Sequence, residues 1–551
     1  MPGMRPGSIA EAAVKAFAGV VGRSNVLEDR ATLSAAATAT FATTAGVPLI
    51  VRPGSREEVQ QCVRVAVEHR VALYPISTGL NWGYGSRVPA SDGNVILDLG
   101  RLSRIVDFSE SLAYVTVEPG VTQQQLFEFL RARGSRLWMD ATGTSPAASL
   151  IGNTMERGFG HTPYGDHFAH VCAFEVVLGD GSCLETGFAR FGQSASAPVH
   201  RWGLGPVLDG LFTQSNLGIV TRLTIWLMPA PEYFQAYFFR CEGADGVGPV
   251  VDALRPLKLS GTLRSAVHIG NDYKVLNGLG QYPWAEMAGR TPLLPADMPR
   301  FRERLRIGSW NGSGGLYGTR TQVKEARRLV KRQLKSIVSH LEFLDEPRLG
   351  LAKRFARPYG LLTGWDLSAA LALLEPVYGL MRGVPTSQPL ASAYWRKRTP
   401  PPAQMDPDRD GCGLLWSAPV APMEGAHAQH LAAIATEVLL AHGFEPLISM
   451  TLVTERAITC VVSISYDREI EGEDARALAC YRALLDALTA QGYHSYRLGI
   501  QAMSRGTSAD NSQMLLAQLK KVCDPQGILA PGRYGIGAPA HSGATLDESH
   551  S

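Results

Sequence analysis

The feature that most constrains this chain is the loop at residues 75–85, PISTGLNWGYG, which directly follows the apolar residues 71–74. Its three glycines allow positive φ and close backbone approach, and successive N–H groups in such a loop form a nest for an anionic group. The spacing matches neither the G-x-G-x-x-G fingerprint nor the G-x-x-x-x-G-K-[ST] loop, and no lysine follows to reach a γ-phosphate. We interpret the loop as a diphosphate cradle, with a plain surface turn as the alternative.

The size and composition narrow the class of protein. A chain of 551 residues is longer than one hydrophobic core usually organises, so we expect two or more domains. Its 53 basic and 50 acidic residues give a formal charge of +3, which excludes the basic field that nucleic-acid-binding proteins show. The eight cysteines lack C-x-x-C spacing, so we expect neither a metal site nor a disulfide framework. A reducing compartment fits this cysteine pattern best.

Nothing in the sequence indicates a membrane or export signal. Residues 1–22 form a candidate amphipathic helix that contains Glu11 and Lys15, so they lack the continuous apolar core of a signal peptide. No segment approaches the roughly 18 uncharged apolar residues that a membrane-spanning helix needs. We expect a cytoplasmic protein without a membrane partner.

The first part of the chain reads as alternating strands and helices. A strand-like run at 47–51 precedes a helical pattern at 56–70, and this βα unit leads into the glycine loop. Two more strands are expected at 94–99 and 113–117, followed by a helix that starts at Thr122. The pattern predicts two α/β units in series.

A second glycine-containing segment lies at residues 149–167, SLIGNTMERGFGHTPYGDH. A stretch so rich in small and polar groups, placed before the predicted strand at 173–178, is costly unless it wraps a ligand. A turn-forming loop without a ligand is the alternative. The Gly-Asp-Gly turn at 179–181 then predicts a hairpin between two apolar strands.

Five motifs in order carry a resemblance to a known family. They are PISTGLNWGYG, VEPGVT, IGNTMERGFGHTPYGDH, FTQSNLGIVTRLTIWLMP and, near the C-terminus, DPQGILAPGRYGI. Together they resemble the vanillyl-alcohol oxidase and p-cresol methylhydroxylase (4-cresol dehydrogenase) family of FAD-linked oxidoreductases, closely over residues 45–230 and more loosely over 400–536. The resemblance implies an α+β fold, in which a PCMH-type FAD-binding domain of two subdomains carries an inserted α+β cap domain.

The composition changes after residues 229–231, where glycine motifs give way to long helical patterns at 321–344, 427–443 and 475–492. We take this change as the start of the cap that shapes the substrate pocket. The predicted division is an FAD-binding domain at 1–230, the cap at 231–491, a return to the FAD domain at 492–536 and a disordered tail at 537–551.

The resemblance assigns residues to the cofactor. The expected contacts of the FAD diphosphate are Pro75, Ile76, Ser77, Thr78, Gly79, Leu80 and Asn81. The expected contacts of the isoalloxazine and ribityl chain are Gly152, Asn153, Gly158, Gly165 and Ile219. Arg497 suits the negative charge that develops near flavin N1, and Arg533 suits the flavin or its phosphates, because arginine is a permanently protonated donor.

The mode of FAD attachment departs from the family pattern. Family members often tether FAD through a histidine or tyrosine at the position where this chain has Leu414, in GLLWSAPV. Leucine cannot form that bond. His161 or a cysteine elsewhere is the remaining candidate for a tether, and we predict non-covalent FAD.

The resemblance also suggests a substrate. Family members that oxidise para-substituted phenols bind the phenol as a phenolate through two tyrosines and an arginine, and the matching positions here are Tyr84, Tyr496 and Arg497. The phenolate supplies electrons as hydride leaves the benzylic carbon for flavin N5, which gives a quinone methide. As isolated residues, the tyrosines would more often be packing groups with one satisfied hydroxyl.

Two changes point away from a simple 4-alkylphenol. The family's carboxylate base near the flavin aligns with Thr142–Thr144 here, and Asp140 aligns better with a different family aspartate, so the usual base is expected to be absent. A family tyrosine is replaced by His161, which is either a base or a stacked, structural histidine. The substrate could then be an alcohol or amine of a biosynthetic pathway.

We therefore predict an FAD-dependent oxidoreductase that takes hydride from a benzylic carbon or an alcohol, preferably of a para-substituted phenol. Dioxygen or an electron-acceptor protein would reoxidise the flavin, and we expect a homodimer. One rival is a flavin-dependent 2-hydroxyacid dehydrogenase that holds a carboxylate with Arg157 and either Arg396 or Arg398. Another is a flavin-binding subunit that partners a cytochrome.

Overall fold

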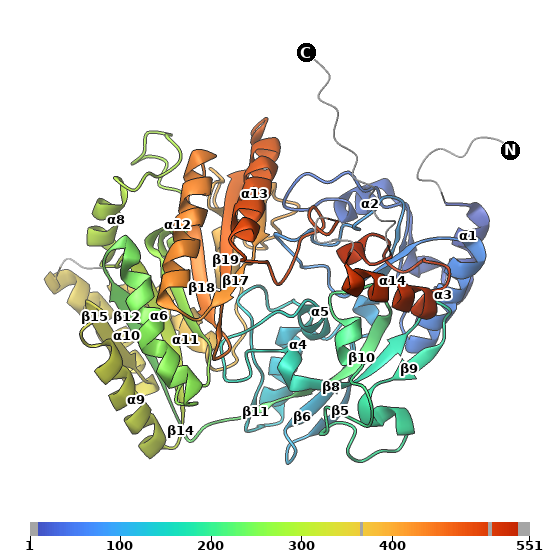
Figure 1. Cartoon of the computed structure of the whole chain (residues 1–551), viewed down its shortest axis with the longest axis horizontal. Helices are drawn as coiled ribbons and strands as arrows, with labels where there is room; N and C mark the ends of the chain where they lie inside the picture. The colour runs from blue at the N-terminus through green and yellow to red at the C-terminus, as the bar shows by residue number, and fades with distance from the viewer. Residues whose placement is uncertain (1–8, 364–366, 505–509, 538–551) are drawn as a thin grey trace.

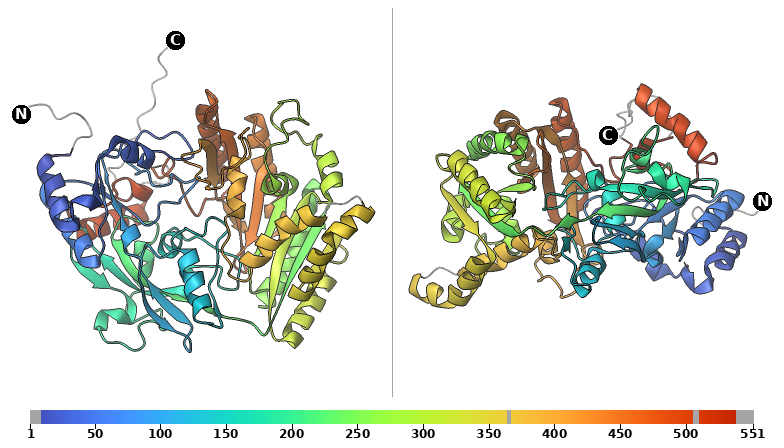
Figure 2. Two further views of the ribbon diagram at one scale, coloured as in Figure 1. Left: turned by 180° about the vertical axis from the view of Figure 1, so that it is seen from behind. Right: turned by 90° about the horizontal axis from the view of Figure 1, so that it is seen from below.

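The computed structural model describes residues 9–363, 367–504 and 510–537. It consists of two halves that lie side by side (Figure 1 and Figure 2). One half contains the N-terminal elements and the C-terminal helix α14 (Asn511–Cys523), and the other is built on one large sheet from the middle of the chain. The fold is α+β, as predicted. The tail predicted at 537–551 lies, apart from Gly537, outside the described residues.

The first unit is a four-stranded sheet of order β1-β2-β4-β3, in which β4 runs parallel to both β2 and β3. Helix α3 connects β2 to β3, and Ser55 caps its start by accepting a hydrogen bond from the Glu58 N–H at 3.2 Å. Strand β3 is partly buried and leads straight into the glycine loop, so the sheet fixes where that loop begins. The elements are α1 (Glu11–Val21), β1 (Val26–Leu27), α2 (Arg30–Ala36), β2 (Ile50–Val51), α3 (Arg56–His69), β3 (Leu73–Ile76) and β4 (Val95–Asp98).

The second unit is an antiparallel sheet of order β5-β6-β10-β8-β9. Thr122 caps α4 through the Gln125 N–H, and the predicted turn at 179–181 joins β8 to β9. The second glycine segment runs from α5 to β8, so both glycine-containing segments lie in this half. The elements are β5 (Ile105–Ser109), β6 (Tyr114–Val117), α4 (Gln123–Ala132), β7 (Leu137–Trp138), α5 (Leu150–Met155), β8 (Val171–Val177), β9 (Cys183–Glu185), β10 (Ile219–Trp226) and β11 (Met228–Pro229).

The other half is an eight-stranded sheet of order β15-β12-β14-β13-β18-β19-β16, with β17 beside β19. Its strands are β12 (Tyr233–Cys241), β13 (Val267–Asn271), β14 (Trp310–Gly318), β15 (His340–Leu344), β16 (Cys412–Ser417), β17 (Val420–Pro422), β18 (Leu447–Leu452) and β19 (Ala457–Asp467). Its helices are α6 (Val247–Leu259), α7 (Asp272–Leu279), α8 (Met298–Leu305), α9 (Arg320–Leu334), α10 (Glu346–Thr363), α11 (Leu367–Leu380), α12 (Gly425–Ala441) and α13 (Glu473–Ala490).

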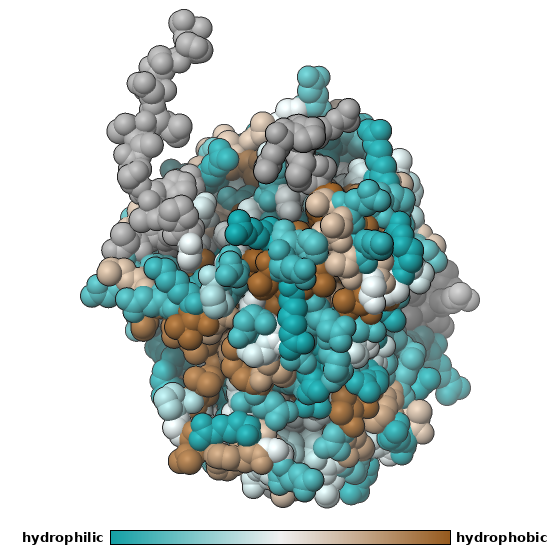
Figure 3. Space-filling view, turned by 90° about the vertical axis from the view of Figure 1, so that its right-hand side faces the viewer, coloured by the Kyte–Doolittle hydropathy of each residue, from teal (hydrophilic) through white to brown (hydrophobic). Residues whose placement is uncertain are grey.

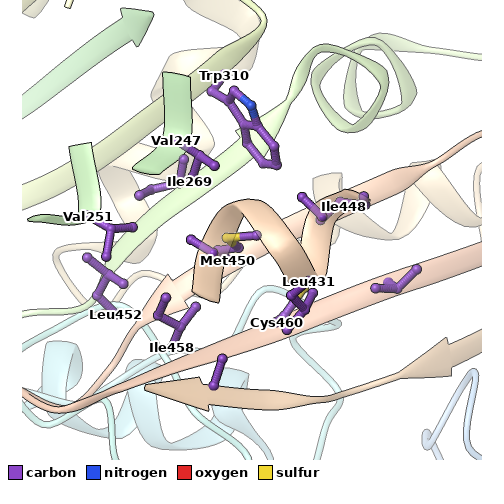
Figure 4. Close-up of a cluster of buried hydrophobic side chains, with 14 of the residues drawn as sticks. Val247, Val251, Ile269, Trp310, Leu431, Ile448, Met450, Leu452, Ile458 and Cys460 are labelled. Atoms are coloured by element: carbon purple, nitrogen blue, oxygen red, sulfur yellow. The ribbon is translucent and has the colours of Figure 1, made fainter. Parts of the chain in front are cut away.

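Alternation along these strands separates a helix-covered face from a face with polar residues. Ile269 of β13, Met450 of β18 and Cys460 of β19 pack with apolar side chains of α6 and α12 in the largest core of the molecule (Figure 4). The intervening residues, such as His268 and Thr451, therefore point to the opposite face. The face of the sheet that carries His268 and Thr451 is therefore not covered by α6 and α12.

One predicted element is partly wrong. The helical pattern at 321–344 ends as a helix at Leu334, and residues 340–344 form β15 instead. The edge strand pairs antiparallel with β12, where Phe343 lies opposite Tyr237, so sheet pairing overrides the helical periodicity of its last residues. The boundaries predicted at 231 and 491 stay predictions, although β12 begins just after the first and α13 ends just before the second.

The C-terminal segment returns to the first half (Figure 1). The Leu73 N–H donates to the Ile528 carbonyl at 2.8 Å, and the Ala530 N–H donates to the Leu73 carbonyl at 2.7 Å. Lys520 of α14 donates to the Asn216 and Leu529 carbonyls. These contacts place the residues after α14 beside the strand that leads into the glycine loop.

Hydrophobic side chains are scattered on one side of the molecule. Figure 3 shows the outer side of the first half, where hydrophobic side chains lie in separate patches among hydrophilic ones. None of the helices in the described part of the chain is both long and apolar enough to cross a membrane. The predicted homodimer and cytoplasmic location stay predictions.

Candidate functional site

A long cleft in the first half gathers most of the predicted cofactor residues. The space inside it, including the part open to solvent, is about 1310 Å³. Its lining includes the predicted residues Pro75, Ile76, Ser77, Thr78, Gly79, Leu80, Asn81, Tyr84, Gly152, Asn153, Ile219, Arg497 and Arg533.

The two glycine segments meet at the floor of this cleft. A Cβ on Gly152 would lie 2.3 Å from Ser77 Oγ, so only glycine lets the two segments approach this closely. The Ser149 N–H donates to Thr78 Oγ1 at 3.2 Å and ties the start of α5 to the first loop. Gly79, with φ of 70°, supplies the backbone turn inside the first loop.

Glu156 connects the two predicted arginines, and the sequence analysis missed it. Its carboxylate pairs with the Arg533 guanidinium, lies 3.4 Å from Arg497 Nε and accepts a hydrogen bond from the Tyr534 hydroxyl at 2.8 Å. Glu156 is only 6% exposed, and a buried carboxylate is stable only when paired in this way. Arg497 also donates to Asn81 Oδ1, which links the network to the first loop.

Tyr84 and Tyr496 both lie beside Arg497. The Arg497 guanidinium carbon is 4.2 Å from the centre of the Tyr84 ring. Burial is the largest effect on both tyrosines, and it raises the pKa of each above its ordinary value, against the opposing effect of Arg497. Both hydroxyls therefore stay protonated at neutral pH and are available as hydrogen-bond donors. Tyr496 does not line the cleft directly.

Trp416 of β16 covers this group from the other half. Its ring is 5.6 Å from the Tyr84 ring in an edge-to-face arrangement. A Cβ on Gly83 would lie 3.0 Å from the indole, so the glycine at 83 lets the indole approach. Leu414, two residues earlier on the same strand, is buried among apolar side chains and offers no atom for a flavin tether.

His161 lies at the junction of the two halves, outside the lining of the cleft. Its ring stacks on His268 of β13 with centroids 4.0 Å apart. Burial, followed by the neighbouring His268 and His167, lowers the pKa of His161 well below its ordinary value. The imidazole is therefore neutral at pH 7. No sequence signal pointed to His268, because it comes from the predicted cap.

Asp140 does not occupy the position of a free base. Its Oδ1 accepts from the Thr162 N–H and its Oδ2 lies 2.6 Å from His167 Nε2, so both oxygens are used. His167 Nδ1 lies 2.6 Å from Asn153 Oδ1, which continues the chain toward the cleft. Both carboxylate oxygens of Asp140 therefore have partners, and the expected absence of the family's carboxylate base stays a prediction.

Two predicted cofactor contacts lie behind the cleft rather than along it. A Cβ on Gly158 would lie 2.2 Å from Asn153 Oδ1, and a Cβ on Gly165 would lie 3.0 Å from the Gly160 and Thr162 carbonyls. Both glycines let neighbouring groups pack, and neither lines the cleft. A direct contact of either one with FAD has no support in this geometry.

The arginines of the hydroxyacid rival have other partners. Arg396 is buried and pairs with Glu445 at 2.9 Å, while Arg157 donates to Thr213 Oγ1. Arg398 lies 4.3 Å over the Trp284 ring. None of the three lines the cleft.

Comparison with known proteins defines the family. Residues 47–187 match the model of the FAD binding domain. The chain is 32% identical over 484 residues to the 4-cresol dehydrogenase [hydroxylating] flavoprotein subunit of Pseudomonas putida, covering 87% of this chain and 86% of that protein. The chain belongs to the vanillyl-alcohol oxidase and p-cresol methylhydroxylase family. It is an FAD-dependent enzyme.

Two further relatives refine the comparison. The crystal structure of p-cresol methylhydroxylase with substrate bound superposes with a TM-score of 0.85 at 30% identity, covering 96% of this chain and 98% of that one. The 1'-carboxy-chondrochloren decarboxylase of Chondromyces crocatus is 48% identical over 526 residues, covering 95% of this chain and 97% of that protein. The family therefore includes relatives named for two different reactions.

The cleft of this family member fits FAD. The Gly152–Ser77 approach leaves a cradle that a side chain at 152 would fill, and Arg497 and Arg533 supply fixed positive charge for phosphate or reduced flavin. Because Glu156 pairs with both arginines, its negative charge reduces the net positive charge in the cleft. Two partly buried arginines in one cleft require a nearby negative charge, and this requirement was the only indication in the sequence that a residue such as Glu156 would lie between them.

Replacing Glu156 by glutamine is expected to raise the reduction potential of the bound FAD. The change leaves two arginines without their shared carboxylate, and the added positive field favours the reduced, more negative flavin. About 1.4 kcal/mol corresponds to about 30 mV for a two-electron couple, which is the size we expect. Spectroelectrochemical titration measures it, with Glu325→Gln, from an exposed pair on α9, as the control. An unchanged or lower potential would contradict the role of Glu156.

Proposed function

We propose that the enzyme oxidises a para-substituted phenol at the benzylic carbon and that the adjacent carbon of the substrate carries a carboxylate, which leaves as CO2. The observation that carries the first part is the grouping of Tyr84 and Tyr496 beside Arg497, of which Tyr84 and Arg497 line the cleft. The second part is favoured by the relative named a decarboxylase and by the engagement of both Asp140 oxygens with Thr162 and His167.

Arg497 and the two tyrosines would hold the substrate as its phenolate. An unperturbed phenol has a pKa of about 10, and a cation with two neutral donors around the oxygen lowers that value. FAD, when bound, supplies the two-electron acceptor that receives hydride from the benzylic carbon. As the hydride leaves, an electron pair from the phenolate oxygen replaces it and the substrate becomes a quinone methide.

The carboxylate then completes the reaction without a protein base. The bond between the carboxylate carbon and its neighbour breaks, and its electron pair forms a vinyl double bond and restores the phenolate. CO2 leaves neutral. Hydroxylation or desaturation of the same quinone methide would instead need a base to activate water or remove a proton. Thr144 lines the cleft where the family's carboxylate base is expected, and it cannot serve as that base.

The proposal is tested by anaerobic mixing with a panel of substrates. We expect 3-(4-hydroxyphenyl)propanoate and 4-ethylphenol to bleach the flavin and D-lactate to leave it oxidised. Bleaching by D-lactate alone would favour the hydroxyacid rival. Failure of every phenol would favour a flavin-binding subunit instead. Mixing the reduced enzyme with dioxygen then distinguishes an oxidase from an enzyme that needs an electron-acceptor protein.

Tyr84→Phe is expected to slow flavin reduction by a phenol about 10-fold and to leave the FAD content unchanged. Loss of a hydrogen bond to a charged group weakens the interaction by about 1.5–3 kcal/mol. Stopped-flow absorbance measures the rate. The control is Tyr114→Phe, which removes a hydroxyl that bonds Asp107 away from the cleft. A rate equal to that of wild type would mean that the loop at 75–85 serves the cofactor alone.

A further inference from the structure

A line of three side chains in hydrogen-bond contact ends at the cofactor cleft. Asp140 Oδ2 lies 2.6 Å from His167 Nε2, and His167 Nδ1 lies 2.6 Å from Asn153 Oδ1. Of the three residues, Asn153 lines the cleft and the other two do not. All three line a second cavity of about 460 Å³, including the part open to solvent. The line therefore runs from this second cavity to the cleft and meets the cleft at the Asn153 amide.

The far end of this line is held firmly. Asp140 Oδ1 accepts a hydrogen bond from the Thr162 N–H at 2.6 Å, and its side chain is only 5% exposed. A Cβ on Gly160 would lie 1.5 Å from Asp140 Oδ2, so only glycine leaves room for the carboxylate there. A carboxylate that engages one nitrogen of an imidazole fixes the orientation of the ring. Asp140 therefore fixes the direction in which His167 Nδ1 points.

The near end of the line is an amide with one group left over. Because Asn153 Oδ1 is turned toward His167, the amide nitrogen Nδ2 points away from the imidazole. Nδ2 makes no hydrogen bond to any residue that the structure describes, and the Asn153 side chain is partly exposed. An amide nitrogen carries two hydrogens that it can donate. The Asn153 NH2 group is therefore available to a ligand in the cleft.

The position of Asn153 on α5 shows which part of the cleft this donor serves. Asn153 and Glu156 are three residues apart, so they lie one above the other on the same side of the helix. Glu156 lies 3.4 Å from Arg497 Nε, and Arg497 packs on the Tyr84 ring. All four residues line the cleft. Asn153 is therefore near the arginine that suits the negative charge at the pyrimidine edge of the flavin.

We propose that Asp140 and His167 are positioning residues, which turn the Asn153 amide so that its NH2 group donates to a carbonyl oxygen at the pyrimidine edge of the FAD isoalloxazine. The inference concerns the cofactor and does not depend on the substrate, so it goes beyond the proposed function. A donor fixed at that edge stabilises the negative charge of the reduced flavin more than it stabilises the oxidised flavin. The line therefore raises the reduction potential of the bound cofactor.

Two substitutions of His167 separate its two contacts. An asparagine side chain ends where Nδ1 of an imidazole lies, and a glutamine side chain ends where Nε2 lies. His167→Asn therefore keeps a donor to Asn153, whereas His167→Gln keeps only a contact with Asp140. His170→Gln is the matched control, because His170 lines the same second cavity but contacts the Asp166 carbonyl. Spectroelectrochemical titration of the FAD-loaded proteins measures the reduction potential of each.

We expect Asn153→Ala and His167→Gln each to lower the potential by about 30 mV, which is a tenfold change in the equilibrium constant of a two-electron couple. His167→Asn and His170→Gln should stay near the wild-type value. Because His167 acts through Asn153, the variant that combines Asn153→Ala with His167→Gln should match Asn153→Ala alone.

An unchanged or higher potential in Asn153→Ala would overturn the donor role. Asn153→Ala keeps both Asp140 and His167, so it decides this point even if His167→Gln does not retain FAD. Equal falls in His167→Asn and His167→Gln, or additive falls in the combined variant, would overturn the positioning role.

Discussion

Arg497→Met is expected to slow flavin reduction by a phenol about 1000-fold at pH 7. Arg497 is the cation beside both Tyr84 and Tyr496, and in the proposed function it provides most of the stabilisation of the phenolate. Removal of a donor aimed at developing negative charge typically costs about 2.7–4 kcal/mol in the transition state. The side chain also lines the cofactor cleft, so FAD content is measured first and the rate is expressed per bound flavin.

The pH dependence of this variant separates phenolate stabilisation from general damage. A free phenol ionises near pH 10, so the rate of Arg497→Met should rise steadily between pH 7 and pH 10 as the substrate loses its proton in solution. The wild type, which in the proposed function binds the phenolate at neutral pH, should change less over that range. Lys331→Met, on the exposed face of α9, controls for loss of one positive charge. A loss of the same size at every pH would contradict the phenolate role.

Gly152→Leu is expected to lower the affinity for FAD at least about 100-fold, roughly 2.7 kcal/mol. A Cβ at this position would already lie 2.3 Å from Ser77 Oγ, and the rest of a leucine side chain would project into the cradle between the two glycine segments. Gel filtration followed by flavin absorbance measures the retained FAD. Gly210→Leu is the control, because nothing lies within 4 Å of a Cβ there.

A graded pair of variants tests the contact itself. Gly152→Ala should lose less FAD than Gly152→Leu, since the Ser77 hydroxyl can turn away from one methyl group. Adding Ser77→Ala removes the atom that the methyl group meets and should restore FAD binding toward the wild-type value. If the double variant binds FAD no better than Gly152→Ala, the close approach of the two segments is not what forms the cradle.

Motifs that depend on local backbone requirements were predictable from the sequence. Glycine at positions 79 and 152 indicates a positive φ or a close approach of two segments. In the structure Gly79 has a positive φ, and Gly152 lets its segment approach Ser77. Tyr84 and Arg497, far apart in the chain, could be brought together only through the family resemblance, because no local pattern relates the glycine loop to the C-terminal return. The structure places them 4.2 Å apart, ring centre to guanidinium carbon.

Residues whose role depends on a partner from the other half were not predictable. In the sequence, His268 looks like an ordinary strand residue, and only the fold shows that it stacks on His161. Trp416 likewise looks like a core aromatic residue, and only the fold shows that its indole packs against Gly83. Glu156 is one charge among many in the sequence, and only the fold shows that it pairs with two arginines. Long-range packing, which local periodicity does not encode, determines all three.

A single-turnover experiment under nitrogen tests whether oxidation of the phenol is coupled to loss of its carboxylate. The FAD-loaded enzyme is mixed with 3-(4-hydroxyphenyl)propanoate, and reduced flavin, CO2 and 4-vinylphenol are measured in the same sample. We expect one CO2 and one 4-vinylphenol for each flavin reduced. Flavin reduction with the carboxylate still attached to the product, or no reduction by this acid at all, would contradict it.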